Sequence, residues 1–340
     1  MKCRKLLVAS AIVLTASACE QARVPTATIA IGDPSFAAGP SGRLKSFRVP
    51  TDGSDPKHIA LGPDGAMWFT ESHIDVSQIG RIDADGNITE FVVPTRGSQP
   101  SDIVAGVDGA LWFTEPTGFP FASIGRIATD GQITEFNPCE GVFSCTVVPN
   151  GIAAAPDGSI WFTESNGNAI GKLDPSTRQF TFYPIPTSSA GPAGITLGPD
   201  GALWFAEFHA NQIGRITTSG VVTEFPGATG PERITSGPDG NLWYTSPFGN
   251  RIGRITTAGV ITEFPVAAPS QPRDIVAGPD GNLWFTEFNA DRLSQITPDG
   301  VITEVKSVRG GPWGIGGGVG NDLWIVQRDG NKVARFTLRE

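Results

Sequence analysis

The sequence has few charged residues, few cysteines and, after its first 18 residues, no long apolar run. Charged residues make up 17% of the 340 positions, whereas Gly and Pro number 43 and 28. This composition argues against long helices and favours many short strands joined by tight turns. No later apolar run approaches the ~20 residues that span a membrane as a helix. The mature chain is therefore predicted to be soluble, or held at a membrane only through an attached lipid.

Basic residues are also scarce relative to acidic ones. The chain has 25 Lys and Arg against 34 Asp and Glu, a formal net charge of -9. Such a surface repels phosphate backbones and anionic headgroups. No nucleic-acid partner is expected.

Residues 1–18 have the pattern of an export signal. Basic MKCRK is followed by an apolar run over residues 6–14 and by Ala-Ser-Ala at 16–18, a typical cleavage site. Because Cys19 comes next, two destinations stay open: a cell-envelope lipoprotein acylated on Cys19, or a secreted protein. Residues 19–41 are rich in Ala, Pro, Thr and Gly and are predicted to form a flexible tether to one domain over 42–340.

Two further cysteines, Cys139 and Cys145, lie close together in the sequence NPCEGVFSCTVVP. In an exported protein this spacing predicts a local disulfide. Metal binding is the alternative, although no His or further Cys lies near them in sequence.

A ten-residue phrase recurs throughout the chain. GPDGALWFAE at 198–207 returns as GPDGAMWFTE at 62–71 and GPDGNLWFTE at 278–287. A period of about 42 residues with strand-forming segments is typical of β-propellers. The all-β fold predicted is a seven-bladed β-propeller with four-stranded blades, one blade for each of Trp68, Trp112, Trp161, Trp204, Trp243, Trp284 and Trp324.

Each repeat divides into four short strands. In residues 192–226, Pro-Asp-Gly supplies the backbone conformations that a tight turn requires. Leu203 and Phe205 alternate with Trp204, so the second strand should bury both of its faces. Each Trp is expected to pack between neighbouring blades.

The two ends of the chain complement each other. After Trp324 only one more strand follows, at 331–338, so the last blade lacks its fourth strand. The segment RLKSFRVP at 43–50 has the form of a fourth strand. We expect this N-terminal strand to join the last blade and close the ring, which removes an exposed edge. A monomer is expected.

Function should lie in residues that vary on this constant frame. Two sets of side chains should meet at one mouth of the central channel: the pair after each first-strand Pro and the residues that follow each second strand. From the first set we predict a group of ligand-binding residues, and the alternative is that these residues only solvate the mouth. The predicted ligand-binding residues are Lys57, Asp102, Glu232, Arg233, Arg273, Asp274 and Trp313.

The three histidines of the chain, His58, His73 and His209, all map to this mouth. His58 could form a metal site with Glu71, or an acid/base site with Glu71 and His73; the alternative is that they are polar rim residues. His209 is the remaining catalytic candidate. The position of Glu71 is occupied by Glu in five of seven repeats, so this Glu is expected to have a structural role. Its partner would be either a backbone N–H or the Arg of the third-strand I-G-R-I phrase.

The repeated phrases GPDGNLWFTE, NQIGRITTSG and VVTEFP resemble those of the streptogramin lyases, the virginiamycin B lyase family, over residues 43–340. The resemblance implies a seven-bladed propeller. For the true lyases it also implies magnesium-dependent β-elimination, which opens a cyclic depsipeptide antibiotic at its ester without water.

The same resemblance implies two catalytic His and two Glu near the last two blades. This chain has Arg273, Trp313, Gly311 and Arg328 at those positions. Arg is not a base at neutral pH, so the lyase site is not expected to be retained. Two functions remain open. One is a propeller that binds a small molecule, glycan or protein at its mouth; the other is a divergent metal-dependent lyase or hydrolase, with Mg as cofactor only in that case.

Overall fold

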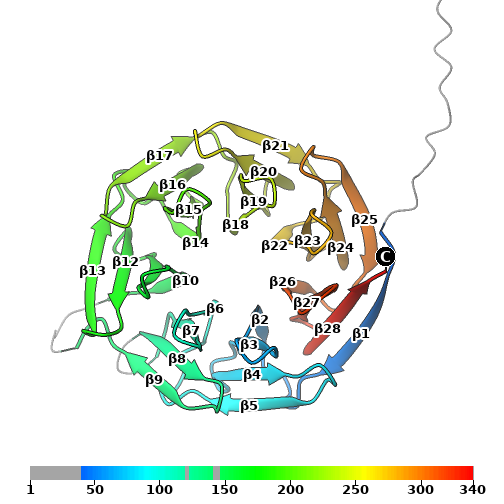
Figure 1. Cartoon of the computed structure of the whole chain (residues 1–340), viewed down its shortest axis with the longest axis horizontal. Coiled ribbons are helices and arrows are strands. Elements are labelled where there is room, and N and C mark those ends of the chain that lie inside the picture. The colour runs from blue at the N-terminus through cyan, green and yellow to red at the C-terminus, as the bar shows by residue number, and fades with distance from the viewer. Residues whose placement is uncertain (1–39, 119–121, 141–145, 340) are drawn as a thin grey trace, which may run out of the picture. The chain divides into compact units, whose positions relative to one another are not determined.

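The computed structural model describes residues 40–118, 122–140 and 146–339. Seven four-stranded antiparallel sheets are arranged in a ring (Figure 1), and the described residues contain no helix. The prediction of a seven-bladed β-propeller is confirmed. Blade 1 comprises β2–β5, the next five blades follow in chain order, and blade 7 comprises β26, β27, β28 and β1.

Within each blade the four strands lie side by side, from an innermost strand at the channel to an outermost strand at the rim. The innermost are β2 (Pro56–Leu61), β6 (Ile103–Ala105), β10 (Pro149–Ala154), β14 (Pro192–Leu197), β18 (Ile234–Ser236), β22 (Pro272–Ala277) and β26 (Pro312–Gly317). The second strands are β3 (Met67–Glu71), β7 (Ala110–Glu115), β11 (Ile160–Glu164), β15 (Leu203–Glu207), β19 (Leu242–Ser246), β23 (Leu283–Glu287) and β27 (Asp322–Gln327).

The two outer strands complete each sheet. The third strands are β4 (Gln78–Ile82), β8 (Ser123–Ala128), β12 (Ala169–Asp174), β16 (Gln212–Ile216), β20 (Arg251–Ile255), β24 (Arg292–Ile296) and β28 (Lys332–Leu338). The outermost are β5 (Ile88–Val92), β9 (Ile133–Phe136), β13 (Gln179–Pro184), β17 (Val222–Pro226), β21 (Ile261–Pro265), β25 (Ile302–Ser307) and β1 (Gly42–Arg48).

The core lies between blades, as the alternation of the second strand predicted. Trp204 packs toward blade 5 with Ile234 and Tyr244, whereas Leu203 and Phe205 pack toward blade 3. All three side chains have no exposed surface. Burial of a large apolar side chain contributes about 2–3 kcal/mol, so each blade is stabilised mainly by its two neighbours.

The phrases of the repeat have separate structural roles. The turn carboxylate of Asp200 accepts from Trp204 Nε1 at 2.9 Å and from Arg215 Nε at 2.7 Å. A Cβ at Gly214 would lie 2.1 Å from the Phe205 ring, so the Gly of I-G-R-I is required for close packing. The Arg of that phrase thus pairs with the turn Asp, and the expectation that it partners the second-strand Glu is wrong here.

The ring closes through the N-terminal strand, as expected. β1 pairs with β28 in antiparallel register from Gly42 opposite Leu338 to Arg48 opposite Lys332. Beyond this ladder, Arg339 N donates to Ser41 O at 2.9 Å. Blade 7 is therefore built from both ends of the chain.

Several predictions fall on residues outside the described ranges. The signal peptide, Cys19 and nearly all of the tether lie there, as does Cys145. Cys139 is described and buried. A search of the described residues finds no helix long and apolar enough to cross a membrane.

Candidate functional site at the channel mouth

The mouth of the channel is shaped by bulges in the innermost strands. In β14, Pro192 pairs with Glu207 but Ile195 pairs with Phe205, so one residue is extra. The same shift occurs in β2, β10, β22 and β26. Bulges re-aim side chains, and the residues after the Pro in four of these strands line a cavity of about 220 Å³ at the mouth.

The Thr of the W-F-T phrase fixes these bulges to one another. Thr70 Oγ1 accepts from His58 N and donates to Ser101 O in the next blade, at 3.1 and 2.9 Å. The same bridge is made by Thr114, Thr163, Thr245 and Thr286. The mouth residues are thus positioned by hydrogen bonds that run from blade to blade.

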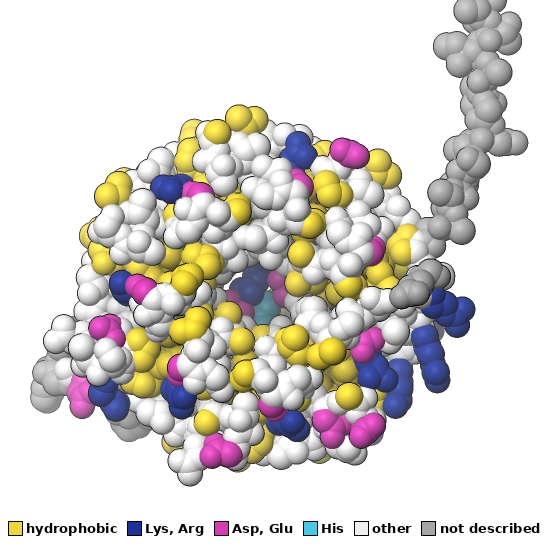
Figure 2. Space-filling model, in the orientation of Figure 1, with side chains coloured by type: hydrophobic (Ala, Val, Ile, Leu, Met, Phe, Trp, Pro, Cys, Tyr) yellow, Lys and Arg dark blue, Asp and Glu magenta, His cyan; other side chains and the backbone are white. Residues whose placement is uncertain are grey.

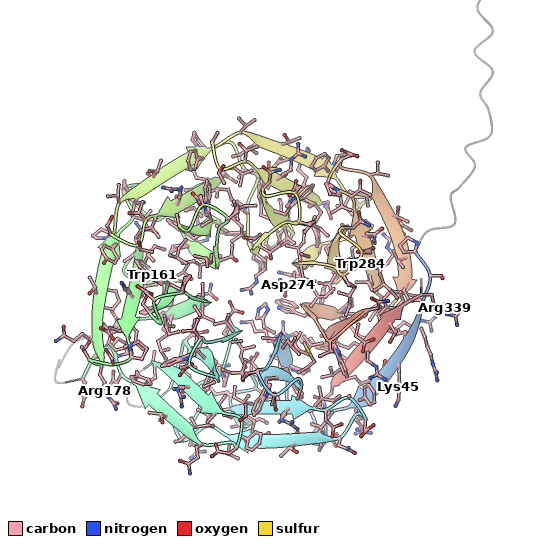
Figure 3. All side chains as sticks on the ribbon, viewed as in Figure 1. Lys45, Trp161, Arg178, Asp274, Trp284 and Arg339 are labelled. Atoms are coloured by element: carbon pink, nitrogen blue, oxygen red, sulfur yellow. The ribbon has the colours of Figure 1, made fainter. Side chains whose placement is uncertain are left out.

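Arg233 extends across the channel. Its guanidinium, on blade 5, makes two hydrogen bonds to Asp102 on blade 2, at 2.8 and 2.9 Å. Its Nε lies 3.4 Å from Asp274 on blade 6. Asp274 projects into the channel (Figure 3), and basic, acidic and His side chains are visible within it (Figure 2). Three of the predicted residues, Asp102, Arg233 and Asp274, therefore form a bridge of charged side chains across the ring.

Both carboxylates are also bonded to the backbone of the following blade. Asp102 accepts from Ile152 N at 3.1 Å, and Asp274 accepts from Ile315 N at 3.0 Å. Burial is the largest influence and opposes their ionisation, but the charge of Arg233, the hydrogen bonds that the carboxylates accept and the nearby His58 together outweigh it, so the pKa of Asp102 lies below its usual value and that of Asp274 falls to about 2. Both are ionised at neutral pH.

His58 belongs to this bridge. Its Nδ1 lies 3.5 Å from Asp274 Oδ2, and the side chain is buried. Burial, and then the charge of Arg233, lower the pKa of His58, so the imidazole is neutral at pH 7. His58 and Arg233 line both the mouth cavity and a lower cavity of about 260 Å³. The bridge therefore separates the two halves of the channel.

Glu71 and His73 do not join His58. Glu71 is buried at the end of β3, and burial, followed by the charge of Glu90, raises its pKa to about 8. His73 is exposed, and its Nδ1 accepts from Asp75 N at 3.3 Å. Within the described residues no group of three or more His, Cys, Asp or Glu could hold a metal ion.

The second-strand Glu differs in its partners between blades. Glu164 accepts from backbone N–H groups of Val148 and Asn166 at 2.8 and 3.0 Å, as expected. Glu287 pairs with Arg292 at 2.9 Å. In blades 1, 2 and 4 a Glu of the fourth strand, Glu90, Glu135 or Glu224, lies nearby instead, and its charge adds to the effect of burial in raising the pKa of Glu71, Glu115 or Glu207.

A second layer of charged and aromatic residues lies above the bridge. Arg273 pairs with Glu232 at 3.2 Å and stacks over Trp313, 4.3 Å from the ring centroid. Arg328 stacks on the same ring at 4.7 Å and pairs with Asp55 at 3.0 Å. Trp313 is thus contacted by two guanidinium groups, and Lys57 donates to Ser101 Oγ at 2.7 Å beside them.

Next to this stack a groove of about 430 Å³ crosses blades 3 to 6. It is lined by apolar and polar groups that include Asn150, Pro192, Phe208, His209, Phe248 and Arg273. Phe208 packs against His209 and Phe248 with ring centroids 5.2 and 5.7 Å apart. Phe248 is 67% exposed, so an aromatic face is available to a ligand.

The aromatic residues of the groove were missed by the sequence analysis. Phe208 directly follows the second-strand Glu of blade 4, where blades 1 to 3 have Ser72, Pro116 and Ser165, and Phe248 lies one position further along in blade 5. A comparison of the repeats at these two positions would have revealed them.

Comparison with known proteins decides the family. A family model described as the virginiamycin B lyase family matches residues 36–230 and 226–340. The chain belongs to the virginiamycin B lyase family. It is 36% identical to the virginiamycin B lyase of Staphylococcus aureus, with a TM-score of 0.80, over 88% of this chain and 100% of that chain. A search of the curated proteins finds no match.

Other solved structures extend the comparison. A streptogramin B lyase is 36% identical over 88% of this chain and 98% of that chain, with a TM-score of 0.79. A catalytically inactive variant of the S. aureus lyase has been solved with quinupristin. The extracellular domain of a one component system from B. thetaiotaomicron, 10% identical over 87% of this chain and 40% of that chain with a TM-score of 0.67, shares the fold alone.

Within this virginiamycin B lyase family member, the four positions at which the resemblance implies catalytic groups lie together. Arg273 and Arg328 stack on Trp313, and Arg328 N donates to Gly311 O at 3.0 Å. A Cβ at Gly311 would lie 2.8 Å from Phe288 and 2.9 Å from Asp329. The chain therefore has a packed cation–aromatic stack at these positions.

Proposed function

We propose that this family member binds an organic ligand at the mouth of its channel and does not open streptogramins by β-elimination. The observation that carries the proposal is the stack of Arg273, Trp313 and Arg328, which stand at positions where the resemblance implies catalytic groups. The stack offers aromatic and cationic surface. It offers no group that titrates near neutral pH.

The chemistry of these side chains does not fit the magnesium ion of the family. Mg²⁺ binds carboxylate and other oxygen ligands, whereas two guanidinium groups repel a cation. Arg273 and Arg328 also cannot act as general bases, because guanidinium stays protonated in proteins. The carboxylates nearest to them, Glu232 and Asp55, are already paired with these two Arg.

The groove supports the binding half of the proposal. A volume of about 430 Å³ lies in the range of small-molecule sites, about 300–1,000 Å³. Aromatic faces at Phe208 and Phe248 can stack on an apolar or sugar ring, while Asn150 and Arg273 can fix polar groups. A small molecule, one residue of a glycan or a side chain of a protein ligand fits this description.

The test uses quinupristin, which a relative binds in a solved structure. Purified protein is incubated with quinupristin and magnesium, and we expect binding without the linear product that mass spectrometry would detect. Loss of general-base catalysis alone costs about 10²- to 10⁴-fold in rate. Turnover that a chelator abolishes would refute the proposal, and His58, His73 and His209 would then be replaced singly by Ala to find the base.

Binding is followed by tryptophan fluorescence. Seven of the eight Trp are buried in the frame, whereas Trp313 is half-buried at the mouth. Quinupristin should therefore change the emission of the native protein and leave that of Trp313→Phe nearly unchanged. Equal changes in both proteins, or none in either, would contradict a site at the mouth.

Export from the cytoplasm is part of the same proposal. It is supported by the basic, apolar and Ala-Ser-Ala segments of residues 1–18. A ligand of this site would then be met in the cell envelope or outside the cell.

A further inference from the structure

A cluster of cations lies on the outer edge of blade 7. Arg43 and Lys45 of β1, Arg335 of β28 and Arg339 surround a hollow of about 420 Å³ together with Thr337. We call these four cations the basic edge. Lys45 and Arg339 point outward from the rim (Figure 3), and dark blue side chains gather on that side of the molecule (Figure 2). The cluster stands out in a chain with a net charge of -9.

The basic edge departs from the repeat. Lys45 lies directly opposite Arg335 in the β1–β28 ladder, so both side chains point to one face. In the other six blades the residue at the position of Lys45 is Thr: Thr89, Thr134, Thr181, Thr223, Thr262 and Thr303. Like charges directly opposite each other destabilise a sheet. The requirements of the repeated blade structure therefore do not explain why Lys is present at position 45.

Arg335 has also lost the partner that three of its equivalents keep. Arg81, Arg126 and Arg215 bind the turn Asp of their own blades at 2.6–2.7 Å. Blade 7 has Gly320 in place of that Asp, and Arg335 lies 3.9 Å from Asp322 while it donates to Ala84 O. Arg43, Lys45 and Arg339 have no ion pair within the described ranges, so among these residues only the 3.9 Å approach of Asp322 to Arg335 offsets the positive charge of this edge.

The basic edge lies where the described part of the chain begins. β1 begins at Gly42, and Arg339 N donates to Ser41 O. Cys19 precedes Pro40 by 21 positions. A chain of that length reaches at most about 70 Å, so acylation of Cys19 would keep the basic edge close to a membrane and at high local concentration.

We propose that the basic edge docks the propeller on a membrane surface rich in anionic phospholipid headgroups. Arg binds phosphate with two parallel hydrogen bonds, and basic residues near an anionic surface attract it within a Debye length of about 10 Å. Although the net charge of the whole chain is negative, the four charged side chains of this edge are all positive.

Docking through the basic edge would leave the mouth accessible. Leu338 N donates to Asn321 O, in the turn between β26 and β27. The mouth lies at the other end of β27, beyond Gln327. The membrane would therefore lie toward the opposite face of the ring, and the groove would open to the aqueous side.

The repeat itself supplies the variant that tests the proposal. Lys45→Thr and Arg43→Val install residues that other blades have at these positions, Thr in six blades and Val at 221, 260 and 301. The double variant removes two charges without damaging the frame, and its melting temperature should equal or exceed that of the native chain. The matched control is Arg96→Thr with Arg309→Thr, which removes two exposed cations from loops elsewhere.

Binding is measured by cosedimentation with vesicles of phosphatidylcholine alone or with about 30% phosphatidylglycerol, in about 0.1 M salt. The full chain is used throughout, so residues 1–39 contribute equally to every variant. Native protein and the control should bind the anionic vesicles more than the neutral ones. The K45T/R43V variant should bind the anionic vesicles about 10- to 30-fold more weakly, since each basic residue contributes about 5-fold.

Three results would overturn the proposal: native protein that does not distinguish the two vesicles, a K45T/R43V variant that binds like native protein, or a control that weakens as much as that variant. The last would assign the effect to net charge alone. Circular dichroism of each variant verifies that the propeller is folded.

Discussion

Glu71, Glu115 and Glu207 carry protons in this fold because burial and a second Glu both disfavour their charge. The pKa of Glu71 and of Glu207 is raised to about 8, whereas in the unfolded chain each ionises near its usual value. Between about pH 5 and pH 8 the folded chain therefore binds more protons than the unfolded chain. Stability contributed by these residues is complete at the acidic end and falls as pH rises toward 8.

Glu71→Gln should remove this dependence for blade 1. Gln needs no proton and can donate its amide N–H to Glu90, and Gln is the native residue at the same position in blade 7, Gln327. The melting temperature should rise by about 2–5 °C at pH 8.5 and change little at pH 5. Differential scanning calorimetry at both pH values measures it.

Glu164→Gln is the matched control for this prediction. The Glu164 carboxylate accepts from several backbone N–H groups, so the substitution should lower the melting temperature at pH 8.5. If the melting temperature at pH 8.5 rose in both variants, proximity to Glu90 would not be the cause of the rise in Glu71→Gln.

At the scale of the strand, β1 is the element on which closure depends. It pairs with β28 along its length. Leu44 packs into the core between blades 6 and 7, and Phe47 stacks on Trp324 at 5.9 Å. Without β1, β28 would present an open edge of unpaired N–H and C=O groups.

Deletion of residues 42–48 should therefore lower the melting temperature by about 10 °C or more, or cause aggregation. The two lost apolar side chains alone contribute about 3–6 kcal/mol. Thermal unfolding and light scattering measure the effect. Deletion of residues 20–39, which leaves β1 in place, should change neither the melting temperature nor the light scattering. If both deletion variants melted at similar temperatures, β1 would not be required for closure of the ring.

Sequence periodicity predicted the blades and the closing strand because a repeated Trp and a period-2 pattern report local structure directly. The expected strand at 43–50 agrees with β1 at 42–48. The pairing across the channel could not be predicted, because Arg233 reaches Asp102 three blades away and the repeat specifies only neighbours. Likewise the repeat does not specify the surroundings of the second-strand Glu: the third strand supplies a cation for Glu287, Arg292, whereas the charge nearest to Glu71 is that of Glu90.

At the scale of the whole molecule, one ring presents two different surfaces. The mouth collects paired charges and aromatic faces, while the basic edge lies on the outside of blade 7. A lipid on Cys19 would limit the distance of the ring from a membrane, and the basic edge would set its orientation. The two contributions respond differently to salt, because screening weakens charge attraction and leaves an acyl anchor intact.

Cys19→Ser should release the exported protein from membranes into the soluble fraction once about 0.5 M salt has removed electrostatic attachment. Native protein should stay with the membranes under the same wash. Fractionation and immunoblotting measure this. Native protein that is already soluble after the wash would show that Cys19 is not acylated.

Closure by β1 also sets an order of events during synthesis. The ribosome makes β1 before any blade, yet its partner β28 is among the last residues of the chain. The first strand must wait, unpaired, until β28 has been made, so the ring cannot close on a product that lacks that strand. A chain truncated before residue 332 keeps two open edges, one on β1 and one on β27, which proteases that survey unfolded polypeptides can recognise. The joint between β1 and β28 thus forms only on a chain that carries all seven blades.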